Sequence, residues 1–98
     1  MNSRRFSISQ DAEGVYRFKG ELTIHDIQCL KHVLDSVLAR CRKITISMEE
    51  LTFADTAALQ LLLAFRRSLT SRIKWVVKDL SSEMDTILTV SGLKSFLT

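Results

Sequence analysis

Glycine, cysteine and long hydrophobic runs are scarce in this sequence, and each scarcity excludes a class of protein. The three glycines, Gly14, Gly20 and Gly92, stand too far apart to form a loop that cradles a phosphate group. The longest uninterrupted apolar run, residues 61–65, has five members, whereas a membrane-spanning helix needs about 20. The sequence therefore predicts neither a phosphate-binding loop of that type nor a transmembrane segment.

The two cysteines also argue against a disulfide framework. Cys29 and Cys41 lie twelve residues apart and fall on one expected helix and its end. Straight helix geometry separates them by roughly 18 Å, far beyond the reach of a disulfide. No apolar segment follows the basic start of the chain, so no signal peptide is expected. We expect reduced thiols in a cytoplasmic protein.

No group of side chains forms a recognisable catalytic or metal-binding motif. His25 and His32 are seven residues apart, but no Cys, Asp or Glu spacing completes a metal site around them. Glu49 and Glu50 are adjacent, and we expect them to point apart into solvent. No Ser or Cys stands in the context of a nucleophile elbow. The sequence therefore favours a binding or switching module without cofactor, metal or enzymatic activity.

Composition and charge are those of an ordinary globular domain. The 98 residues are 46% hydrophobic and 26% charged, which predicts a single domain over residues 1–98. The net charge is +3, and the basic residues are spread along the chain among eleven acids. This spread predicts a solvated surface and no nucleic-acid partner.

The first third of the chain predicts a hairpin followed by a helix. Apolar and polar residues alternate along residues 6–9 and again along residues 16–19, which is typical of two paired strands. Thr23, followed three residues later by Asp26, is a near capping box and predicts a helix start. The apolar positions of residues 27–41 then recur at three- and four-residue steps, as in an amphipathic helix.

The stretch around which the chain is organised is residues 43–69. Residues 44–48 alternate as a strand with one buried face, and a connector at residues 49–54 follows. Asp55 and Thr56 favour helix N-caps, and the Ala/Leu-rich run behind them has high helix propensity. A hydroxyl thus stands where a strand gives way to a helix, at the edge of an α/β sheet where ligands and partners usually bind.

The remaining elements complete a two-layer fold. Residues 73–77 alternate as a fourth strand, and Ser81 or Ser82 begins a last helix that Gly92 ends. Right-handed crossovers place helices on the same side of a parallel sheet. We predict an α/β fold with a four-stranded mixed sheet, a β-hairpin and then parallel β-α-β-α-β, with helices on one face and the other face bare.

The segment ITISMEELTFADTAALQLLLAF resembles the hallmark of the STAS family, the domain of sulphate transporters and anti-sigma-factor antagonists. In that hallmark a strand and a Leu-x-Phe-x-Asp connector lead through Ser or Thr into the second helix. The residues at those places are Leu51, Phe53, Asp55, Thr56 and Leu59. The likeness extends in element order over residues 6–92 and is similar to small stand-alone bacterial members.

The resemblance implies a protein-interaction switch. In members that act as anti-sigma antagonists, a partner kinase of the histidine-kinase-like ATPase fold, itself the anti-sigma factor, phosphorylates the hydroxyl after the Asp. Thr56 matches that residue. A phosphate adds about −1.5 to −2 charges, which can break binding without unfolding the domain. The residues expected to contact the partner are Thr52, Asp55, Thr56, Ala57, Leu59 and Leu63.

Other interpretations stay open. Asp55 or Thr56 can simply cap the helix, and Leu59 and Leu63 can serve ordinary core contact instead of docking. Ala57 and Ala58 stand where the family usually continues with Gly, as in STAS adaptors of chemotaxis, two-component or lipid-transporting ABC systems. The chain can therefore be a constitutive adaptor on a transporter ATPase or chemotaxis component. A nucleotide or small ligand near Thr52 and Asp55 is a third hypothesis, and a homodimer could cover the bare face.

Overall fold

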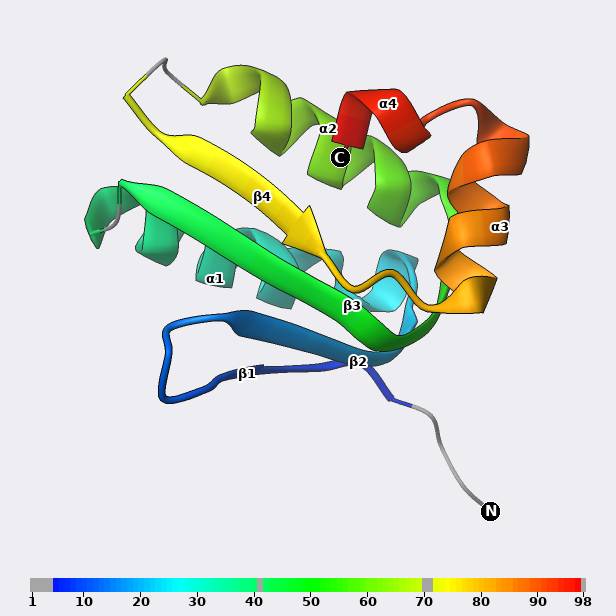
Figure 1. Cartoon of the computed structure of the whole chain (residues 1–98), viewed down its shortest axis with the longest axis horizontal. Coiled ribbons are helices and arrows are strands. Elements are labelled where there is room, and N and C mark those ends of the chain that lie inside the picture. The colour runs from blue at the N-terminus through cyan, green and yellow to red at the C-terminus, as the bar shows by residue number, and fades with distance from the viewer. Residues whose placement is uncertain (1–4, 41, 70–71, 98) are drawn as a thin grey trace.

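A four-stranded mixed sheet carries the helices of this protein (Figure 1). The structure is a computed structural model that describes residues 5–40, 42–69 and 72–97. Its elements in chain order are β1 (Ser7–Gln10), β2 (Tyr16–Leu22), the 3-10 helix η1 (Ile24–Asp26), α1 (Ile27–Arg40), β3 (Lys43–Ala54), α2 (Thr56–Ser68), β4 (Lys74–Lys78), α3 (Ser82–Ser91) and α4 (Lys94–Leu97). Cys41 lies outside the described residues, and Cys29 is an exposed, free thiol.

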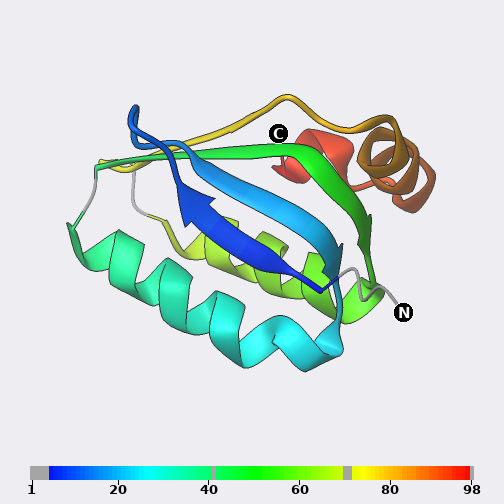
Figure 2. The same ribbon diagram turned by 90° about the horizontal axis from the view of Figure 1, so that it is seen from below.

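The sheet has the predicted topology. Its strand order is β1-β2-β3-β4, with β1 and β2 antiparallel and the other pairs parallel. Figure 2 shows α1 and α2 side by side on one face of the sheet, while α3 and α4 lie toward one end at the level of the strands. Figure 1 views the sheet from its opposite face, so that α1 and α2 lie behind the level of the strands. The prediction of a mixed sheet with helices on one face is therefore confirmed.

The core lies between the sheet and the helices. The alternating side chains of β3 point into it, because Ile44, Ile46 and Met48 are all buried. Leu30 and Leu34 of α1 meet them from below the sheet, and the ring centroids of Phe65 and Trp75 lie 5.8 Å apart. The helices thus hold the sheet by the apolar faces that the sequence period predicts.

Local capping signals are observed where the sequence predicts them. The Thr23 backbone N–H donates to Asp26 Oδ2 at 2.9 Å, and the Thr23 hydroxyl accepts from the His25 N–H, so the capping box is complete. Ser81 caps α3, and Gly92 ends it with a positive φ of 76°. That left-handed conformation costs glycine little and other residues more.

The expectation of a connector at residues 49–54 is wrong, because β3 continues through it to Ala54. Two register shifts in the pairing of β2 with β3 let the strand continue while its side chains depart from strict alternation. Leu51 and Ala54, three residues apart, are both buried as a result. The predicted strand therefore ends too early in the sequence, where its period of two is lost.

The last residues form an element that the sequence does not reveal. The short helix α4 brings Leu97 into the core, where it is buried. The Trp75 indole Nε1–H donates to the Leu97 carbonyl oxygen at 2.7 Å. This buried bond fastens α4 beside β4.

Candidate functional site

Asp55 ties the starts of two helical segments together at the end of β3. Its Oδ1 accepts the Ala58 N–H at 2.9 Å and so caps α2. Its Oδ2 accepts the Ile24 N–H at 2.8 Å, from a residue 31 positions earlier in the chain. The Asp55 N–H in turn donates to the Leu22 carbonyl at 3.1 Å. Asp55 therefore fixes the junction between β2 and η1 and the junction between β3 and α2.

Thr56, the first residue of α2, is exposed. Because Asp55 supplies the cap, the Thr56 hydroxyl is not needed for it. Within the part of the chain that the structure describes, that hydroxyl has no hydrogen-bond partner. The first backbone N–H groups of a helix carry partial positive charge, which favours an anion at this position. The two adjacent residues thus have different places in the structure, one internal and one facing solvent.

Exposed apolar side chains gather around this pair. Ile24 is 60% exposed, Phe53 41% and Val90 82%, which is unusual for large apolar residues. Ile24 bonds to Asp55 through its backbone, Phe53 lies two residues before Asp55, and Val90 projects from α3. Phe53 of β3 and Val90 of α3 therefore contribute apolar surface beside the Thr56 side chain, and Ile24 adds an exposed apolar residue bonded to Asp55.

A groove of about 490 Å³ runs between the start of α2 and α3 beside this surface. We call it the docking groove. Its lining residues are Phe53, Ala54, Asp55, Thr56, Leu59, Thr86, Ile87, Val90 and Ser91. No Lys or Arg is among them, so the groove offers no cation to a phosphate-bearing ligand. Its apolar lining with a polar rim is typical of a surface that receives a peptide or protein.

The structure gathers only part of the residue set expected to contact a partner. Asp55, Thr56 and Leu59 line the docking groove, although Leu59 is only 4% exposed and packs mainly in the core. The other three lie outside its lining. Thr52 donates its hydroxyl to the Gly20 carbonyl at 3.2 Å, and Ala57 and Leu63 are half-buried.

Sequence reasoning missed the contributions of η1 and α3. Ile24 follows the capping threonine, at a position where an apolar residue gives no sign of its exposure. Ile87 of α3 lies half-buried against the core while also lining the groove. Val90 is exposed on the same helix, but only the packing of α3 against β3 brings it near Thr56.

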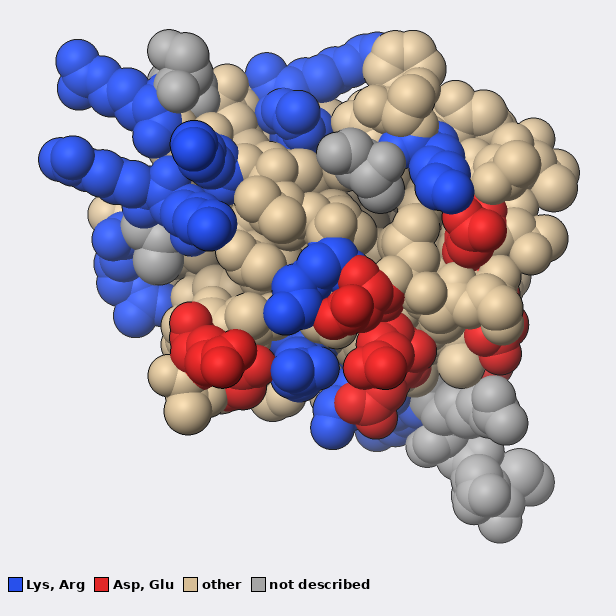
Figure 3. All heavy atoms as spheres, in the orientation of Figure 1, with Lys and Arg blue, Asp and Glu red and all other residues tan. Residues whose placement is uncertain are grey.

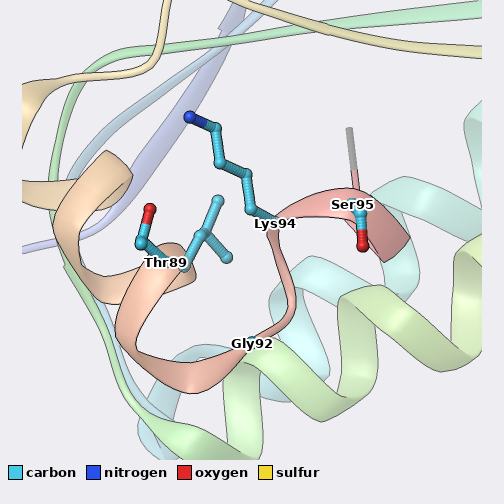
Figure 4. A pocket seen from close by; sticks show the side chains of 5 residues that line it. Thr89, Gly92, Lys94 and Ser95 are labelled. Atoms are coloured by element: carbon cyan, nitrogen blue, oxygen red, sulfur yellow. The ribbon is translucent and has the colours of Figure 1, made fainter.

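A second hollow lies at the turn between α3 and α4. It measures about 460 Å³ and is lined by Leu88, Thr89, Gly92, Lys94 and Ser95. Figure 4 shows Thr89 and Lys94 on the two arms that meet at the turn. The Lys94 ammonium pairs with the Asp85 carboxylate, so its charge is already compensated. This hollow is separate from the docking groove.

A carboxyl group with a lowered pKa, that of Asp11, lies away from the docking groove. The Val15 backbone N–H, followed by that of Glu13 and by the Arg17 guanidinium, holds the pKa of Asp11 below its ordinary value, but Asp11 lies in the hairpin turn. Among the described residues no cluster of His, Cys, Asp or Glu is arranged to hold a metal ion. In the same part of the chain, no helix combines the length and apolarity needed to cross a bilayer.

Solved structures of anti-sigma factor antagonists share the fold of this chain. An anti-sigma factor antagonist from Mycobacterium paratuberculosis superposes with a TM-score of 0.75 at 16% identity, covering 93% of this chain and 80% of that one. The unphosphorylated antagonist SpoIIAA gives 0.70 at 18% identity, covering 96% and 86%. The phosphorylated form of SpoIIAA, a Bacillus cell fate determinant, gives 0.64 at 19% identity, covering 96% and 89%.

A model of the STAS domain family matches residues 6–98. The chain therefore belongs to the STAS domain family, as the residues at its central segment indicate. No curated protein sequence matches it significantly.

Proposed function

We propose that this chain is a non-catalytic interaction switch that binds a protein partner through the docking groove and is controlled by phosphorylation of Thr56. One observation carries the proposal: an exposed hydroxyl without a role in the fold stands on the rim of an apolar groove. The groove supplies binding energy, because burying apolar surface is favourable. The hydroxyl supplies a place where a charge can be added.

The expected effect of phosphorylation follows from this placement. A phosphate on Thr56 adds about −1.5 to −2 charges beside the Asp55 carboxylate. A partner that covers the groove would have to bury that charge against apolar side chains, at a cost of several kcal/mol. The fold itself loses nothing, because Asp55 and not Thr56 caps α2. Phosphorylation is thus expected to block docking and leave the domain folded.

The family supports a protein as partner. Similar structures are of anti-sigma factor antagonists, and one of them is in a phosphorylated form. On this analogy the partner is an anti-sigma factor that acts as a serine or threonine kinase with the histidine-kinase-like ATPase fold. The groove lining, which contains no Lys or Arg, favours a protein over a nucleotide.

The test compares charge at two equivalent helix positions. Thr56 and Ser82 are each the first residue after the N-cap of a helix, and both are exposed. Thr56→Glu is expected to abolish capture of the partner, whereas Ser82→Glu adds the same charge outside the groove and is expected to bind normally. Thr56→Ala is expected to bind constitutively. Equal affinity of the Glu and Ala variants at position 56 would refute the switch.

Modification is tested directly by mass. Intact-mass and phosphopeptide analysis of the protein from its own cells is expected to show partial addition of one phosphate, located at Thr56. Complete absence of phosphate there under all growth conditions would contradict control by phosphorylation. That result would not contradict binding of a partner in the docking groove, which is tested separately.

A constitutive adaptor role is the second candidate, because the groove is already formed in the unmodified chain. Its partner would be a transporter ATPase or a chemotaxis component. Val90→Glu and Phe53→Glu change exposed groove residues and are expected to release such a partner without unfolding the domain. Thr56→Ala and wild type taken from cells in any growth condition would then bind equally. Leu59 is a poor choice for this test, because it is buried in the core.

A further inference from the structure

Basic side chains gather at the end of the molecule opposite the docking groove (Figure 3). This end, which we call the basic pole, is where α1 and α2 finish and where β3 and β4 begin. In sequence order its members come from three separate stretches and look scattered. The residues of the basic pole are Arg40, Arg42, Lys43, Arg66, Arg67, Arg72 and Lys74.

The sheet register brings two of these charges directly beside each other. Lys43 of β3 is the register partner of Lys74 of β4, and the Lys74 N–H donates to the Arg42 carbonyl at 2.9 Å. Like charges on facing strand positions destabilise a sheet. Among the described residues, none of Arg42, Lys43 and Lys74 makes an ion pair with a carboxylate. Within the described part of the chain, the fold therefore keeps a repulsion that no ion pair with an acid offsets.

Acidic residues are absent from the segments that form the pole. The sequence has no Asp or Glu between Asp35 and Glu49, and none between Asp55 and Asp79. The pole holds seven of the fourteen Lys and Arg residues, and the other seven are outnumbered by the eleven acids. Outside the pole the chain thus carries a net charge of −4. The charge of the molecule is therefore unevenly distributed, although Figure 3 also shows acidic side chains below the basic cluster, and an extended anionic surface would attract the pole.

Helix dipoles explain only part of the cluster. Arg40, Arg66 and Arg67 lie in the last turns of α1 and α2, where cations favourably face the negative end of a helix. Lys43 and Lys74 begin strands, so this reason does not apply to them. Apart from solvent, an external anion would compensate these two charges.

We propose that the basic pole binds the surface of an anionic lipid membrane, as a peripheral contact without insertion. Five of its seven members are arginines, whose planar guanidinium groups bind phosphate oxygens in pairs. The contact is independent of the proposed switch, since it leaves the docking groove at the far end of β3 uncovered (Figure 1).

The shape of the pole favours lipid over nucleic acid. Proteins that hold single strands stack bases on exposed aromatic side chains along a charged groove. The exposed large apolar residues of the described chain are Ile24, Phe53, Val90 and Phe96, and none belongs to the pole. The pole is made of helix ends and strand starts, and in the described chain the two long helices α1 and α2 reach it by their last turns. Such an end suits an anionic surface better than the groove of a DNA duplex.

Vesicle co-sedimentation of the full chain tests the proposal. The probe is phosphatidylcholine vesicles containing about one third phosphatidylglycerol, with pure phosphatidylcholine as the neutral control. The double variant Arg67→Gln/Lys74→Gln removes two exposed pole charges, and Lys19→Gln/Lys31→Gln removes two exposed charges elsewhere. Each basic residue near such a surface raises the affinity for the vesicles about fivefold. The affinity of the pole variant for anionic vesicles should therefore fall about 25-fold. The control should lose less than about threefold.

Further controls distinguish an anionic membrane from other anionic ligands. Binding is expected to vanish at about 0.5 M salt, because exposed charges are then screened. Equal binding to neutral vesicles, or equal losses in the two double variants, would overturn the proposal. So would short duplex DNA that holds the chain more tightly than the vesicles do at the same salt and depends on the same pole residues. Circular dichroism of both variants shows whether the fold is kept.

Discussion

The double acceptor role of Asp55 gives the sharpest prediction about stability. Its two carboxylate oxygens accept backbone N–H groups from Ala58 and from Ile24, so one side chain caps α2 and anchors η1. Asp55→Ala removes both acceptors and leaves both donors without their partner. Asp55→Asn keeps one acceptor oxygen and points an amide N–H₂ group toward the other donor.

The magnitude follows from the two bonds. Loss of an N-cap costs about 1 kcal/mol, and loss of a second hydrogen bond to a charged group costs about 1.5 to 3 kcal/mol. Asp55→Ala should therefore lower the free energy of unfolding by about 2 to 4 kcal/mol. For a domain of about 100 residues this lowers Tm by at least about 10 °C. Asp55→Asn should fall between wild type and the alanine variant.

Urea denaturation monitored by circular dichroism measures these differences, with Thr56→Ala as the matched neighbour. Thr56→Ala should stay within about 0.5 kcal/mol of wild type, because its hydroxyl makes no bond within the described chain. If Asp55→Ala unfolds at the same urea concentration as wild type, the assignment of Asp55 as a structural tie is wrong. If Thr56→Ala is the less stable variant, the roles of the two residues are reversed.

Three further perturbations test other parts of the fold. Ser81→Ala removes both the cap of α3 and a buried hydroxyl bond to β3, and should cost about 2 to 3 kcal/mol in urea denaturation. Trp75→Phe removes the indole bond to the Leu97 carbonyl, so proteolysis should cut the chain end sooner while the rest of the domain resists. Because the lowered pKa of Asp11 is due first to the Val15 N–H, its charged form stabilises the folded hairpin above about pH 4. That contribution is lost as the pH falls through the lowered pKa, so the protection factors of the hairpin amides, which correct for the intrinsic pH dependence of exchange, should fall in acid; protection factors that rise as the pH falls would contradict it.

Features set by neighbours in sequence were predictable. The capping box at Thr23 and Asp26 and the stop at Gly92 depend on residues within one helical turn, and the structure has them at those positions. The alternation of residues 44–48 is likewise local, because it depends on the two faces of a single strand. The family resemblance rests on the same local segment, and the match over residues 6–98 confirms it.

Features set by pairing between distant segments were not predictable. The extension of β3 to Ala54 depends on irregular pairing with β2, which breaks the period of two that marks a strand. The contribution of Val90 to the docking groove depends on α3 packing against β3. The basic pole requires Lys43 to meet Lys74, which only the register of β3 and β4 determines. The sequence therefore pointed to Thr56 but missed the surface around it.

The length of β3 sets the relation between the two ends of the molecule. Its twelve residues span roughly 35 Å as an extended strand, from Lys43 at the basic pole to Ala54 beside the docking groove. Electrostatic potential in physiological salt decays over a Debye length of about 8 Å, so that span corresponds to about four such lengths. A charge added at Thr56 is therefore screened from whatever the basic pole contacts. Because β3 separates the two ends by this distance, the charge at Thr56 can change while the basic pole keeps its contact.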